Sequence, residues 1–100
     1  MALDFYDIND TRFKQRLFGF SEQDIEVLDE ALSELKRVSG VVIDPYKTSR
    51  IQSAHIKLLA SYIKKSIDEI NKKEILKISR LNKIYAYLIN VRDGFITVGD

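Results

Sequence analysis

Acidic side chains recur at helical spacing in the segment that follows Ser21. Five of them fall on one side of a helix when each residue is rotated by about 100°: Glu22, Glu26, Asp29, Glu30 and Glu34. Such a cluster can meet a basic protein surface, and charge complementarity of this kind speeds association. A helix that is stabilised only by internal pairs would place Glu four residues before Lys, and almost no Lys is interleaved here. We therefore predict a partner-binding surface, with a solvated helix face as the alternative.

A catalytic site would have to be built around His55, the only imidazole of the chain. As a catalytic residue it would act as a general base near neutral pH. On its expected helix, however, it lies among apolar residues such as Leu58 and Tyr62, so we interpret it as a structural histidine that hydrogen-bonds to the backbone or to a tyrosine. The sequence contains no Gly-rich phosphate loop, GxSxG, HExxH or EF-hand pattern and no Cys. We predict a protein that is not an enzyme and that holds no metal and no cofactor.

Basic residues dominate the second half of the chain and allow a different interpretation. Residues 1–35 hold nine acids against three bases, whereas residues 36–92 hold thirteen bases against four acids. Eight of these bases could form a nucleic-acid footprint: Lys57, Lys64, Lys65, Lys72, Lys73, Lys77, Arg80 and Lys83. They fall at different angles on two expected helices, and no helix-turn-helix signature accompanies them. Solvated helix surface is therefore the favoured interpretation, and nucleic acid is not an expected partner.

The acidic residues are expected on the first of three longer helices. It spans residues 21–39, with Ser21 as the N-cap, Asp24 in the reciprocal position of a capping box, and Gly40 as the stop. A second helix should begin near Ser49 or Ser53 and run to about residue 71. "NKKE" at 71–74 is the expected break, because a single helix from 53 to 92 would far exceed the usual length. The third helix is expected over residues 74–92.

The remaining segments lead to a mainly α prediction for the whole chain. Asn9 or Asp10 could cap a short helix through "TRFKQRLF", with Phe13 and Leu17 facing inward. The β-branched run at residues 41–44 and the tail at residues 95–98 are strand-like, and they could pair as a two-stranded ribbon. We therefore predict one helical domain, residues 1–100, built as a small bundle of three longer helices and a short N-terminal one, with at most this minor ribbon.

Composition favours a small binding module in the cytoplasm. One hundred residues, 45% of them hydrophobic, suffice for a single core but not for the separate lobes of most enzymes. The absence of Cys suits a reducing compartment. The first ten residues lack a basic leader followed by an apolar run, and no apolar stretch approaches the roughly 18 residues that would span a bilayer. We expect a cytoplasmic protein without a membrane partner.

Three short stretches resemble a known family. "MALDFYD", "VVIDPYKTSRI" leading into "SAHIKLL", and "FITVGD" are similar to the pattern of small cytoplasmic immunity proteins that are encoded beside polymorphic or contact-dependent growth-inhibition toxins in bacteria. The resemblance covers about a quarter of the chain. It implies a non-enzymatic antitoxin that binds one toxin domain, often a nuclease rich in Lys and Arg, and blocks its active site.

Within this resemblance, "IDPYKTSRI" is either a binding loop with Tyr46 and Arg50 as anchors or a plain connection between two helices. Two other functional classes stay open. A small nucleic-acid-associated regulator would use the basic side of the second and third helices, and an adaptor or secretion chaperone would use an exposed apolar groove. The favoured expectation is an immunity protein that neutralises a basic toxin domain through its acidic surface.

Overall fold

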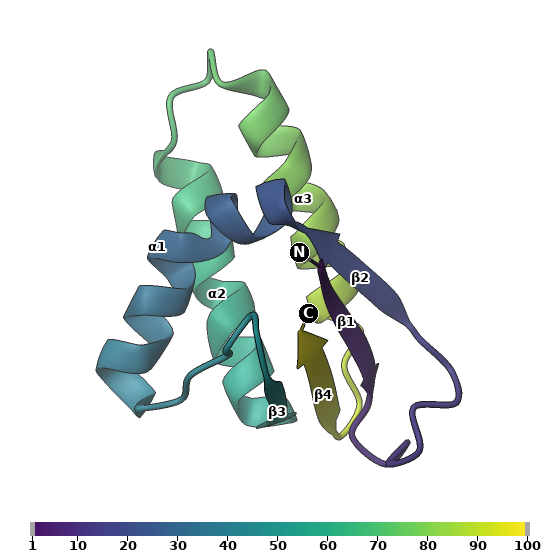
Figure 1. The fold of residues 1–100 in the computed structure, drawn as a ribbon. Helices are drawn as coiled ribbons and strands as arrows, with labels where there is room; N and C mark the ends of the chain where they lie inside the picture. The colour runs from purple at the N-terminus through teal and green to yellow at the C-terminus, as the bar shows by residue number, and fades with distance from the viewer. Residues whose placement is uncertain (1, 100) are drawn as a thin grey trace.

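The computed structural model describes residues 2–99 and shows a four-stranded antiparallel sheet packed against three helices (Figure 1). Along the chain the elements are β1 (Ala2–Asp7), β2 (Phe18–Ser21), α1 (Glu22–Ser39), β3 (Thr48–Gln52), α2 (Ser53–Glu69), α3 (Ile75–Leu88) and β4 (Gly94–Gly99). The strand order is β2-β1-β4-β3. The fold is α+β, so the predicted mainly helical bundle is wrong. Residues 1 and 100 of the predicted domain lie outside the described range.

The sheet joins the two ends of the chain, because β4 pairs with β1 on one side and with β3 on the other. Side chains alternate between the two faces of a strand: Leu3 and Phe5 of β1 are buried, whereas Asp4 between them is partly exposed. The buried face points to the helices and carries an aromatic cluster with ring centroids 4.6 to 5.5 Å apart. Its members are Phe5, Phe18, Phe20 and Phe95.

The three predicted longer helices are confirmed, although α3 ends at Leu88, four residues before the expected end at 92. Ser21 Oγ accepts a hydrogen bond from the Asp24 N–H, and the Asp24 carboxylate accepts one from the Ser21 N–H, which is the reciprocal capping box. Gly40 ends α1 in the left-handed conformation, with φ at 75°. The break at residues 71–74 separates α2 from α3 as expected.

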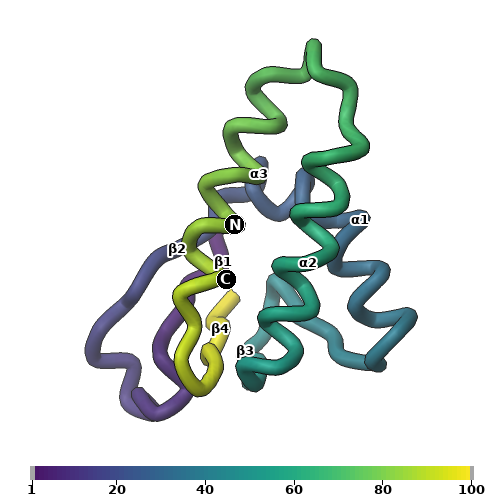
Figure 2. The backbone as a smooth tube through the Cα atoms, turned by 180° about the vertical axis from the view of Figure 1, so that it is seen from behind, coloured from purple at the N-terminus to yellow at the C-terminus, as the bar shows by residue number. Residues whose placement is uncertain are grey.

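The helices form one layer on the sheet and extend beyond it. Seen from behind, α2 and α3 make a hairpin whose turn projects away from the strands, with α1 beside α2 (Figure 2). The molecule is accordingly elongated, with extents of 42 × 25 × 23 Å. No helix within residues 2–99 has the length and apolar character needed to cross a membrane.

The predicted N-terminal helix through residues 11–18 is wrong. Asp10 does cap backbone groups, but its carboxylate accepts the N–H groups of Lys14 and Gln15 in a local turn that competes with helix formation. These backbone hydrogen bonds lower the pKa of Asp10. The hydrogen bond from the Gln15 N–H has the largest effect, and the one from the Lys14 N–H comes next. Phe13 adopts a positive φ of 53° and packs on Tyr6 with ring centroids 5.1 Å apart. Phe13 and Leu17 are therefore exposed and do not face a core.

The predicted ribbon between residues 41–44 and 95–98 is also wrong, although the tail is a strand. Residues 41–47 form the connection from α1 to β3, and the partners of β4 are β1 and the segment "TSRIQ". Ser49, one of the two expected starts of the second helix, lies in β3, whereas Ser53 is the actual start. Strand pairing depends on partners distant in sequence, so the β-branched run alone did not identify the strand.

Candidate protein-docking groove

A groove with acidic walls lies between α1 and the α2–α3 hairpin. Its larger part is a cavity of about 370 Å³. α1 contributes Glu26, Asp29 and Glu30 to the wall, and the end of α2 contributes Glu69. The first turns of α3 add Lys77 as the single cation of this part. Carboxylates from two separate helices thus face one hollow.

The groove continues along α1 into a smaller cavity of about 180 Å³. Glu30 and Glu69 line both parts, and Glu34 and Lys65 are added in the second. We call the combined hollow the acidic groove and define it by its five carboxylates: Glu26, Asp29, Glu30, Glu34 and Glu69. The lining lysines, Lys65 and Lys77, leave an excess of three negative charges when all seven groups are ionised.

Helix geometry explains the row of acids on α1. Residues four apart are neighbours on a helix surface, so Glu26, Glu30 and Glu34 follow one another along the groove. The opposite side of α1 is anchored in the core by Leu28 and Leu35, which are almost fully buried. The buried apolar residues therefore fix the rotation of α1 that turns its carboxylates to the groove.

In the described part of the chain, only one of the α1 acids in the groove forms a salt bridge. Arg37 donates two hydrogen bonds to the Glu34 carboxylate, one of them from Nε at 3.0 Å. This hydrogen bonding lowers the pKa of Glu34, and the charges of Arg37 and Lys65 act in the same direction. Within the described residues, Glu26, Asp29 and Glu30 form no salt bridge. The negative charge near the N-terminal half of α1 is therefore available to a partner.

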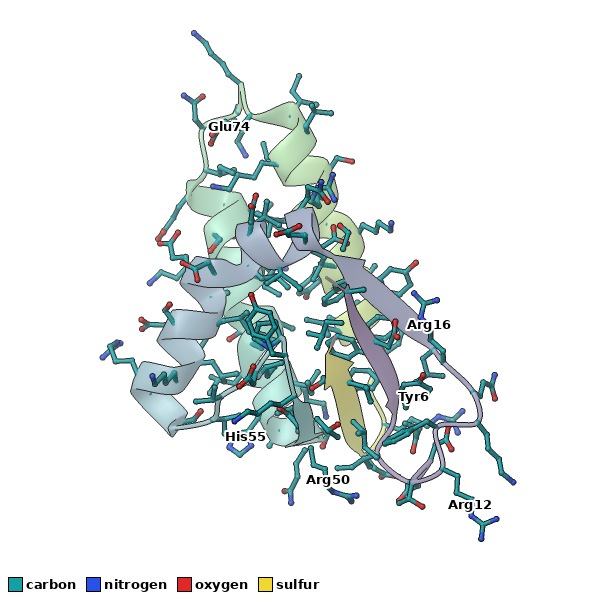
Figure 3. The ribbon with its side chains drawn as sticks, in the orientation of Figure 1. Tyr6, Arg12, Arg16, Arg50, His55 and Glu74 are labelled. Atoms are coloured by element: carbon teal, nitrogen blue, oxygen red, sulfur yellow. The ribbon has the colours of Figure 1, made fainter. Side chains whose placement is uncertain are left out.

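The other residues predicted for partner binding lie outside the groove. Glu22 is exposed in the first turn of α1 but does not line the hollow. Tyr46 is 66% exposed in the connection before β3, and Arg50 is an exposed residue of that edge strand. Arg50 and His55 lie at one end of the molecule and Glu74 at the other (Figure 3). The structure therefore brings four of the seven predicted residues together in the groove and leaves Glu22, Tyr46 and Arg50 outside it.

Glu69 is the acidic groove residue that the sequence interpretation missed, because the second helix was treated as basic. Its position does carry a signal: together with Asp68 it puts two carboxylates in the last turn of α2, where no basic residue balances them. Negative charge is unfavourable at a helix C-terminus. The unfavourable placement of Glu69 is accordingly a sign of a role outside the helix itself.

The basic residues of the hairpin do not form one continuous surface. Arg80 Nη1 lies 2.8 Å from Asp24 Oδ1, and Lys65 and Lys77 line the acidic groove. Three of the eight bases considered as a nucleic-acid footprint thus lie beside carboxylates of α1.

His55 is half-buried near the start of α2. The hydrogen bonds found in residues 2–99 include none from its ring, so the expected hydrogen bond to the backbone or to a tyrosine is not seen. In the same range, no group of three or more His, Cys, Asp or Glu side chains is placed to hold a metal ion. The carboxylates gathered in the acidic groove are suited chemically to bind positively charged groups.

In comparisons with known proteins, no family model, curated protein or solved structure matches the chain.

Proposed function

We propose that this chain is a non-enzymatic binding protein that takes a basic surface of a partner protein into its acidic groove. Within that class we propose an immunity protein that neutralises a cognate bacterial toxin in the cytoplasm. A toxin domain rich in Lys and Arg, such as a nuclease, would present the complementary charge. Both the acidic walls and the resemblance in the three short stretches support this kind of partner.

The observation that carries the proposal is the convergence of five carboxylates from two helices on one hollow. Like charges placed together repel each other and cost stability, and a basic partner relieves that repulsion. The hollow is also long enough to run beside Glu26, Glu30 and Glu34 in succession. A lysine- or arginine-bearing segment laid along it would meet one carboxylate at each turn of α1.

The test begins with the toxin domain encoded beside the gene and measures its binding to wild type and to the double variant Glu26→Lys, Glu30→Lys. We expect roughly tenfold slower association at low salt, because complementary charge mainly steers encounter. The difference should shrink at 1 M salt, where the Debye length falls to about 3 Å. The same variant should protect cells poorly when it is produced together with the toxin.

The matched control reverses two exposed carboxylates outside the groove, Asp68→Lys and Glu74→Lys. It changes the net charge equally and should bind as the wild type does. Exposed substitutions of this kind change stability by less than about 0.5 kcal/mol, which thermal unfolding checks for both variants. Wild-type association by the groove variant would refute the proposed site and move the search to Tyr46 and Arg50. Absence of any complex with the neighbouring toxin would refute the immunity function.

A further inference from the structure

The turn between α2 and α3 exposes aliphatic side chains that the core does not use. Leu76 is 87% exposed and Ile75 is 71% exposed, more than the other large hydrophobic residues that are exposed within residues 2–99. Both lie in the first turn of α3, which begins without a side-chain cap. The turn that precedes them is where the hairpin projects farthest from the sheet (Figure 1).

Exposed lysines flank these two side chains in the sequence, and one of them, Lys77, also lines the acidic groove. We call residues 71–77 the hairpin tip; it carries Lys72, Lys73 and Lys77 against the single acid Glu74. All seven residues of the tip are exposed, and Glu74 among them lies at the end of the molecule (Figure 3). Exposed aliphatic side chains flanked by lysines are a combination that binds the interface of an anionic bilayer.

We propose that the hairpin tip docks on the surface of an anionic lipid bilayer. Ile75 and Leu76 enter the boundary between headgroups and acyl chains, while Lys72 and Lys73 stay at the level of the acidic headgroups. The long Lys stems allow both, because their apolar carbons can follow the aliphatic residues inward while the ammonium groups remain in water. The inference does not depend on the acidic groove, and it departs from the sequence expectation of no membrane partner.

The shape and charge of the tip favour a lipid surface over a protein. A stable protein interface buries about 800 Å² on each side, which a narrow, convex turn cannot supply without a partner that encloses it. A bilayer deforms around a protruding tip and needs no such complementarity. A second copy docking tip to tip would bring two sets of lysines together, and like charges oppose that contact.

The direct test uses a tryptophan reporter, because the chain contains no Trp. Leu76→Trp places one indole on the tip, and Val38→Trp places one at a residue of α1 that is 52% exposed and outside the tip. Both are mixed with vesicles of phosphatidylcholine containing 30% phosphatidylglycerol, and with pure phosphatidylcholine vesicles. We expect a blue shift of the emission only for Leu76→Trp and only with the anionic vesicles.

Binding of the otherwise unchanged chain is then measured by vesicle flotation at millimolar lipid, since weak affinity is expected: even a myristoyl chain gives only about 10⁴ M⁻¹. Ile75→Ser with Leu76→Ser should abolish flotation, and Lys72→Gln with Lys73→Gln should weaken it roughly thirtyfold. The matched control, Val38→Ser with Val42→Ser, should float as the wild type does. All of these residues are exposed, so circular dichroism should show an unchanged fold.

Several results would overturn the proposal. One is an unchanged emission of Leu76→Trp with anionic vesicles, and another is full flotation after removal of the two aliphatic side chains. If polyglutamate shifts the reporter emission while the vesicles do not, the tip binds an acidic protein surface instead. Sedimentation showing a salt-sensitive dimer that excludes vesicles would assign the tip to a second copy.

Discussion

At the scale of single residues, Thr97 has a buried side-chain hydroxyl without a hydrogen-bond partner among the described residues. It lies on β4 two residues after Phe95, on the face that points to the helices, and is opposite Phe5 of β1. The residue is fully buried, and its hydroxyl has no hydrogen-bond partner in the described chain. A buried polar group without a partner lowers stability because it has lost its bond to water.

Thr97→Val should therefore stabilise the protein. Valine keeps the branched shape and the strand preference of threonine but removes the hydroxyl. We expect a gain of about 1 kcal/mol in the free energy of unfolding, measured by urea or thermal denaturation. The control Thr97→Ser keeps the hydroxyl and loses a methyl group, so it should destabilise the protein. A loss of stability in the valine variant would show that the hydroxyl is bonded.

At the scale of elements, Asp24 ties α1 to α3. Its carboxylate closes the capping box with Ser21, and it also accepts a hydrogen bond of 2.8 Å from Arg80 Nη1. Burial acts to raise the pKa of Asp24, but the Ser21 N–H and the Arg80 guanidinium together outweigh it, so the pKa is lowered. The ionised form is thus the one that holds the two helices together.

Asp24→Asn should lower the free energy of unfolding at pH 7 by about 1–3 kcal/mol. Because the folded-state pKa lies below 3.8, the ordinary pKa of an aspartate, the stabilisation is complete above that pH and is lost as the pH falls through the folded pKa. Denaturation curves of wild type and variant should therefore converge on acidification below pH 3.8. Equal stability at neutral pH, or a difference that grows in acid, would contradict this role. Glu22→Gln, which changes an exposed acid of the same turn, is the control.

At the scale of the whole molecule, the last strand decides whether the chain folds. β4 carries Phe95 into the core and is the only link between β1 and β3 in the described sheet. The predicted minor ribbon could be lost without unfolding a helical bundle, whereas the loss of the central strand β4 would separate β3 from β1. The ends of the chain are therefore part of the same cooperative unit as the helices.

Truncation after Asp93 should abolish cooperative unfolding. It removes β4 and leaves the aromatic cluster of β1 and β2 without Phe95, so side-chain packing over the sheet is lost. Far-UV and near-UV circular dichroism with a thermal scan would measure this, with removal of Asp100 alone as the control. A truncated chain that still melts in one sharp transition would mean that the helices fold without the sheet.

Alternation at the start of the chain was a readable strand signal. Leu3 and Phe5, and then Phe18 and Phe20, are buried at a spacing of two, which is the strand period. The possible helix cap at Asn9 or Asp10 pointed instead to a short helix between these two strands. The acidic surface of α1 was predicted from the sequence, but its meeting with Glu69 was not, because that depends on how α1 packs against α2.

The sequence by itself determined the local elements of this protein. α1 with its caps and the break before α3 follow from interactions between residues within about four positions of one another, which a sequence displays directly. The start of α2 was left open between Ser49 and Ser53, and only the pairing of β3 placed it at Ser53. The tertiary structure alone decided the sheet, the acidic groove and the projecting tip. Each of these depends on how distant segments are placed. β4 pairs with β1 across some ninety residues, and Leu76 is exposed because no other described element packs over the start of α3. Long-range packing fixes such features, and no pattern within one segment encodes the partner that another segment supplies.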